Sequence, residues 1–189
     1  DQEKEIIAYH EAGHALVHAK LPNCDPVHKV SIVSRGMALG YTMPLPEEDR
    51  VLQSRSRLKD QIAGLLGGRA AEKIVFDNVT TGAANDLEQA TKLARRMVTE
   101  FGMSEKLGPM VFGQKEELVF LGREIGEQRN YSEEVAQKID EEVRHIVEEA
   151  FARARDIILT YRDKLTELAE RLIQMETLEE YQIQAILAA

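Results

Sequence analysis

The sequence lacks a second cysteine, a long apolar run and an excess of basic residues. Cys24 is the single cysteine, so neither an internal disulfide framework nor a paired-cysteine metal site can form. There is no secretory segment and no apolar stretch near about 18 residues, so no membrane-spanning helix is predicted. The 24 basic residues are outnumbered by 33 acidic ones, giving a net charge of −9. This balance argues against a nucleic-acid partner or an anionic membrane surface.

The Walker-type phosphate-binding loop is also missing, so no nucleotide site of that kind is predicted within these residues. A length of 189 residues is enough for one good core, or for a domain with a small appendage. The chain starts at Asp1, without Met and almost directly in a predicted helix. We therefore expect it to be a fragment of a longer protein.

What the sequence does contain is the pentapeptide His-Glu-Ala-Gly-His at residues 10–14. On an α-helix, residues i and i+4 lie about 40° apart and one turn along the axis, so His10 and His14 can direct two imidazole nitrogens at one point. Glu11 lies about 100° further round, where it can reach a water on a metal but is poorly placed as a third ligand. This is the HExxH pattern of zinc peptidases, with two ligands and a general base.

The residues around the motif favour a site that faces a core. Ile6, Ile7, Val17 and Leu21 fall near the helix face that carries the two histidines. The alternative is a pair of hydrogen-bonded core histidines beside a solvated glutamate. A metal centre is the better interpretation of this spacing on an apolar face.

Periodicity and capping signals predict a mainly α (α+β) domain. We expect a small β-hairpin or sheet near the HExxH helix, with strands over 27–34 and 37–43 and a turn at 34–36. We expect helices at 2–20, at 49 or 54 to 74, and at 85–101, 132 to 159 or 161, 163–175 and 177–187. The chain is thus read as one domain, residues 1–189, with a metal-site half (1–101), irregular loops and a possible small hairpin (102–131) and a bundle of C-terminal helices (132–189).

Four local features support these boundaries. Gly67 and Gly68 lie inside a predicted helix and indicate close packing, which we expect against the first helix. Ser132 is predicted to cap the long helix. Two further N-caps are expected from capping-box spacing, Asn85 with Glu88 and Thr177 with Glu180.

A catalytic zinc requires three protein ligands and an open position, and spacing alone leaves the third ligand undecided. His18 lies about 12 Å along the helix from His10, which is too far for one ion. The long-spacer pattern HExxHxxGxxH fails because its last histidine would fall on Lys20. The remaining histidines have no supporting spacing and are read as structural: His28 and His145. Two carboxylates from later segments stay open as candidates, Glu72 and Asp86.

The second predicted strand offers a place for substrate. Leu39, Gly40 and Tyr41 lie on a segment whose glycine either weakens the strand or marks the close approach of another backbone. An exposed edge beside a peptidase site can bind an extended polypeptide by strand addition. An ordinary edge strand is the alternative.

Six segments, in order, resemble the peptidase domain of the FtsH family, which are membrane-anchored AAA-type zinc proteases. The resemblance covers essentially the whole chain and rests on HEAGH at 10–14, DPVHKV at 25–30, ALGYT at 38–42, GGRAAE at 67–72, TGAAND at 81–86 and FGMS at 101–104. It implies that Asp86 is the third metal ligand and that Glu72 holds the free N–H of a ligand histidine. It also implies one Zn²⁺ per chain and a homo-hexameric ring.

Other implied properties belong to the parent protein. They are ATP use by an AAA module that these residues lack, and attachment through absent N-terminal segments to the cytoplasmic face of a bacterial inner membrane or to an organelle membrane. The fragment itself is expected to be soluble. The implied substrates are unfolded, misfolded or short-lived proteins, including membrane proteins.

The expected activity is metal-assisted amide hydrolysis by a zinc endopeptidase, with Glu11 moving the proton from water to the leaving amine. The competing interpretation is a non-catalytic, ring-forming helical module with a structural metal. A third possibility is a zinc hydrolase of small substrates. Glu11 favours catalysis, because a structural zinc site closes its fourth position and has no use for a carboxylate beside it.

Overall fold

The computed structural model describes residues 1–33, 40–44, 52–116 and 126–189. Its helices are α1 (Gln2–Lys20), α2 (Arg55–Leu65), α3 (Gly67–Phe76), the short 3₁₀ helix η1 (Thr81–Ala83), α4 (Ala84–Thr99), α5 (Glu133–Thr160), α6 (Arg162–Met175) and α7 (Glu180–Ala188). Its strands are β1 (Val27–Ser31), β2 (Tyr41–Pro44), β3 (Gln114–Glu116), β4 (Gly126–Gln128) and β5 (Thr177–Glu179). The predicted class, mainly α with a small β component, is confirmed.

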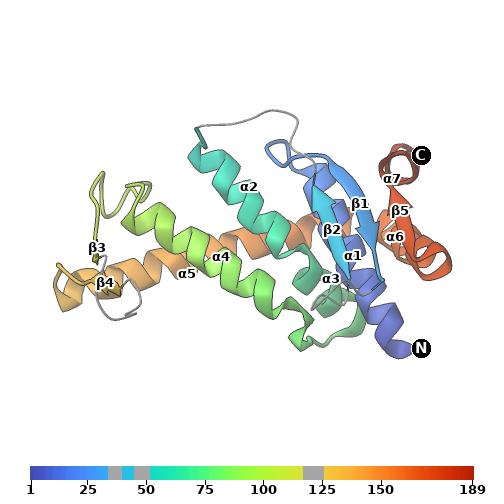
Figure 1. Ribbon diagram of the computed structural model, residues 1–189, viewed down its shortest axis with the longest axis horizontal. Helices are drawn as coiled ribbons and strands as arrows, with labels where there is room; N and C mark the ends of the chain where they lie inside the picture. The colour runs from blue at the N-terminus through green and yellow to red at the C-terminus, as the bar shows by residue number, and fades with distance from the viewer. Residues whose placement is uncertain (34–39, 45–51, 117–125) are drawn as a thin grey trace.

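Helix α1 is the element around which the metal-site half is packed. It has the bounds that the sequence predicts, with Asp1 accepting a hydrogen bond from the Glu3 amide as N-cap, and its middle stretch from His10 to Val17 is buried. Its most extensive contacts are with α3 and α6. Figure 1 shows α1 behind the sheet, with the long helix α5 running across the molecule alongside α4.

The predicted close packing of glycines is confirmed between α1 and α3. A Cβ atom on Gly13 would lie 2.5 Å from the Gly67 carbonyl oxygen, and a Cβ on Gly67 would lie 2.7 Å from the Gly13 carbonyl oxygen. The two backbones can be this close only because neither residue has a side chain. The single helix predicted to residue 74 is instead divided at Leu66 (φ −88°, ψ −3°), where two low-propensity glycines follow.

The sheet on the other side of α1 has the strand order β2-β1-β5, and both pairings are antiparallel. Strand β5 was not predicted: Thr177, expected as an N-cap, pairs with Ser31 instead. The N-cap of α7 is Glu179, in a capping box with Gln182. The predicted turn at 34–36 and Leu39 lie outside the described residues, and the hairpin strands are shorter than expected.

Of the two other predicted helix N-caps, one is wrong and one is confirmed. The N-cap of α4 is Ala83 rather than Asn85, because the preceding turn is already helical as η1 and is capped by the Thr80 hydroxyl. Ser132 caps α5 as predicted and accepts from the Val135 amide. A small hairpin of β3 and β4 does occur between α4 and α5. No helix within the described ranges is both long and apolar enough to span a membrane.

Candidate metal centre

The two motif histidines converge on one point from the buried face of α1. His10 and His14 are each 7 % exposed, and their Nε2 atoms are 3.0 Å apart. The rings meet edge to face, at 76°. The predicted geometry of a residue pair one helical turn apart is therefore realised in the fold.

The opposite ring nitrogens fix the protonation pattern. His10 Nδ1 lies 2.8 Å from Glu72 Oε2 on α3, and His14 Nδ1 lies 2.9 Å from the Gly64 carbonyl oxygen on α2. A carbonyl or carboxylate oxygen only accepts, so each Nδ1 carries the hydrogen and donates it. In the neutral imidazoles both Nε2 atoms are then lone-pair acceptors, and these are the atoms that face each other.

Asp86 adds a third acceptor at the same point. It lies in the first turn of α4, and its Oδ2 is 3.3 Å from His10 Nε2 and 3.1 Å from His14 Nε2. Two ligands of a tetrahedral zinc with bonds near 2.1 Å are separated by about 3.3 Å, so the three atoms fit such an ion. Within the described residues these three side chains form the only cluster of this type.

Without a cation, a proton has to occupy the same place. Burial opposes a charge on His10, but the hydrogen bonds that His10 donates to Asp86 and Glu72, together with the nearby Glu11 charge, outweigh it and raise the pKa of His10 to about 9. Burial also opposes ionisation of Asp86, yet the hydrogen bonds and charges of His10 and His14 lower the pKa of that carboxyl strongly. The site thus favours a positive charge enclosed by one carboxylate and two imidazoles.

Glu72 is itself held in place. Its side chain is 1 % exposed, and the Thr80 hydroxyl donates to Oε1 while Oε2 accepts from His10. Burial raises the pKa of Glu72, but these hydrogen bonds outweigh it and the net direction is downward. Glu72 therefore contacts His10 and lies outside the cluster of three converging atoms.

Comparison with known proteins places this chain in a family. A family model described as Peptidase family M41 matches residues 1–186. This chain belongs to peptidase family M41. It is 58 % identical over 186 residues to the ATP-dependent zinc metalloprotease FtsH 1 of Thermomicrobium roseum, covering 98 % of this chain and 28 % of that protein. It is 56 % identical over 188 residues to the ATP-dependent zinc metalloprotease FtsH of Thermotoga maritima, covering 99 % and 31 %.

The predicted resemblance and the predicted enzyme class are confirmed by this membership. The M41 chain spans less than a third of the length of these relatives. Its predicted general base, Glu11, is buried next to His10 on α1 and accepts a hydrogen bond of 2.7 Å from Thr42 on β2. No motif spacing in the sequence links Thr42 to Glu11, which lies 31 residues earlier, or Thr80 to Glu72, which lies 8 residues earlier.

The other histidines lie apart from the cluster, as expected. His28 on β1 lies beside Glu180, and His145 on α5 lies beside Glu149. His18 packs against Gly64, which could not carry a Cβ without meeting the ring at 2.8 Å. Burial, and then the nearby His14, lower the pKa of His18 to about 4, so its ring is neutral.

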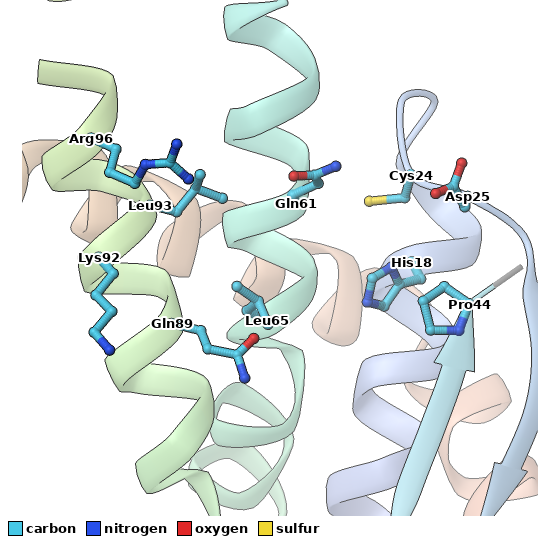
Figure 2. Close-up of a pocket in the computed structure, with 10 residues that line it drawn as sticks. All are labelled: His18, Cys24, Asp25, Pro44, Gln61, Leu65, Gln89, Lys92, Leu93 and Arg96. Atoms are coloured by element: carbon cyan, nitrogen blue, oxygen red, sulfur yellow. The ribbon is translucent and has the colours of Figure 1, made fainter. Parts of the chain in front are cut away.

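A cavity of about 460 Å³ opens beside the metal centre of the M41 chain. Figure 2 shows His18 and Pro44 on one side of it and Lys92, Leu93 and Arg96 of α4 on the other. It begins about one helical turn beyond the ligands, since His18 follows His14 on α1 and Gln89 follows Asp86 on α4. The cavity therefore adjoins the cluster formed by His10, His14 and Asp86.

Proposed function

We propose that this chain is a zinc-dependent endopeptidase domain in which His10, His14 and Asp86 hold the metal and Glu11 is the general base. One observation carries the proposal. Three acceptor atoms converge within 3.0 to 3.3 Å of one another, while the opposite nitrogen of each imidazole donates to an oxygen. Three acceptors this close, two of them on buried imidazoles, repel one another unless a proton or a metal cation lies between them.

The chemistry follows from what the residues can do. A bound zinc ion would polarise the carbonyl of the substrate and would make a water molecule acidic near neutral pH. Glu11 is then placed to accept a proton from that water and to donate it to the leaving amine. Glu72 and the Gly64 carbonyl hold the two imidazoles in the tautomer that leaves each Nε2 free to bind the metal.

We propose that the substrate is an extended polypeptide that pairs with the free edge of β2. Strand β2 pairs with β1 on one side only among the described residues. Tyr41 is its first residue, and Gly40, directly before it, lies next to Glu11. Backbone pairing recognises any extended chain, which suits weak sequence preference. The adjoining cavity offers room for a substrate side chain. Leu39, predicted with them, lies outside the described residues.

We further propose that the domain is the proteolytic part of a longer ATP-driven protease, because the relatives that it matches are more than three times its length and are named ATP-dependent. In that protein the substrates would be unfolded or short-lived proteins, including membrane proteins. A hexameric ring and attachment to a membrane, on the cytoplasmic face of a bacterial inner membrane or in an organelle, form part of the same proposal.

Glu11→Gln tests the function. The amide keeps the size of the side chain but cannot accept the proton, so we expect the variant to bind one zinc per chain and to lose peptide cleavage by about 10²- to 10⁴-fold. Casein cleavage by the parent chain should stop when a chelator removes the metal. Near-normal turnover by Glu11→Gln would remove Glu11 as base. A parent chain that binds zinc but cleaves nothing would favour the alternative of a structural metal.

A further inference from the structure

We propose that Thr42 is a positioning residue for catalysis: its hydroxyl holds the carboxylate of Glu11 against the edge strand of the sheet. The inference rests on the proposed function, since it concerns how the general base is kept in place. It assigns a role to a residue that touches neither the converging ligand atoms nor their immediate partners.

The hydrogen bond has the geometry of a strong one. Thr42 Oγ1 lies 2.7 Å from Glu11 Oε2 and 3.3 Å from the Glu11 carbonyl oxygen. A threonine has one hydroxyl hydrogen, and the shorter contact to the charged oxygen is the one it favours. This bond engages Oε2 and leaves Oε1 with lone pairs that can accept a proton from water. Glu11 is only 7 % exposed, so little bulk water competes for the bond.

The same strand face makes room for the base. Gly40 and Thr42 are two residues apart, so they lie on one face of the extended segment. A Cβ on Gly40 would lie 2.9 Å from the Ser31 carbonyl oxygen and 3.1 Å from Glu11 Cγ, so the absence of a side chain here leaves room for Glu11 beside the strand. Gly40 thus provides the space and Thr42 provides the hydrogen bond.

The sheet in turn fixes the position of Thr42. Its backbone is in register with Val30 on the central strand β1, which is buried and also paired with β5. The general base is therefore anchored to the strand whose free edge would bind the substrate. Loss of the hydroxyl should disturb the orientation of Glu11, and so the rate of the chemical step, without removing the edge that binds the peptide.

The test compares Thr42→Val with Thr42→Ser in the zinc-loaded 189-residue chain. Valine keeps the β-branched shape of a strand residue and removes the hydroxyl, whereas serine keeps the hydroxyl. With a quenched fluorescent peptide, we expect kcat of Thr42→Val to fall about 10- to 100-fold, the effect of losing a hydrogen bond to a charged group. KM should stay within about twofold, because this bond serves the reacting state and not peptide binding. Thr42→Ser should restore kcat to within about threefold of the parent, and all three proteins should bind one zinc.

A second readout does not depend on activity. In a crystal structure of Thr42→Val with zinc bound, the Glu11 carboxylate should have left its place beside β2 while His10 and His14 remain in position. A Glu11 side chain that stays in place would overturn the proposal, as would a kcat within twofold of the parent. A raised KM at normal kcat, loss of zinc, or a serine variant no better than valine would also overturn it. A parent chain that binds zinc but cleaves nothing refutes the proposed function instead, and the crystal structure then still decides whether Thr42 holds Glu11.

Discussion

Gly68 is the position at which a single methyl group should separate metal binding from folding. It lies in the first turn of α3, and a Cβ there would be 2.5 Å from both Cε1 and Nε2 of His10 and 2.7 Å from Cδ2. Ordinary van der Waals contact begins near 3.4 Å. In Gly68→Ala the imidazole must therefore move by about 1 Å. The Nδ1 atom of this ring contacts Glu72, and its Nε2 atom faces His14 at the proposed metal site. A movement of the ring would therefore disturb both contacts.

The size of the effect follows from the tolerance of metal sites. Ligand distances vary by only about 0.2 Å in a working site, and disturbing the groups that orient a ligand costs about 10- to 100-fold in affinity. We expect the upper end, about 100-fold weaker zinc binding, or about 2.8 kcal/mol. Helix propensity acts in the opposite direction, because alanine stabilises a helix interior by about 1 kcal/mol relative to glycine.

The assay is a zinc titration in competition with a chromophoric chelator, together with urea unfolding of the metal-free protein. Lys73→Ala is the matched control on the same helix, since its side chain is exposed and pairs with Asp77 at the surface. The control should bind zinc like the parent. If Gly68→Ala held zinc within threefold of the parent affinity, the contact between Gly68 and the His10 ring would not constrain the site, and the reasoning would fail.

Two further predictions concern the acids and the proton at the site. Asp86→Ala should lose stoichiometric zinc in metal analysis, whereas Glu72→Gln should keep it with about 10- to 100-fold weaker affinity; the reverse order would make Glu72 the ligand. Because the pKa of His10 is raised in the fold, protonated His10 contributes to the stability of the metal-free chain. This contribution is complete below pH 6.5 and is lost as pH rises towards about 9. The lowered pKa of Asp86 acts above pH 3.8 and its contribution is lost in acid. The melting temperature of the metal-free chain should therefore decline between pH 6.5 and 9. With zinc bound it should depend less on pH, because the metal replaces the proton. An unchanged melting temperature of the metal-free chain across this range would contradict the raised pKa of His10.

The fold was predictable where the signals are local. The bounds of α1 follow from the apolar spacing and from Pro22, and the start of α5 follows from the Ser132 cap. The prediction of Asn85 as an N-cap was wrong because a 3₁₀ turn, capped by Thr80 and beginning at Thr81, precedes α4. Strand β5 was missed because its partner β1 lies almost 150 residues earlier, as in the pair Ser31 and Thr177 with a separation of 146, and no local pattern records such a pairing.

The sequence by itself determined the chemistry of this site: two imidazoles one helical turn apart with a carboxylate beside them, because helix geometry is the same in every fold. It could not rank Glu72 against Asp86 by spacing, since both are carboxylates on later segments. The tertiary structure decides their places. Packing of α1 against α3 brings Glu72 to the far nitrogen of His10, and α4 brings Asp86 to the near one. Those contacts depend on close approach of elements distant in the chain, which only the folded core can impose.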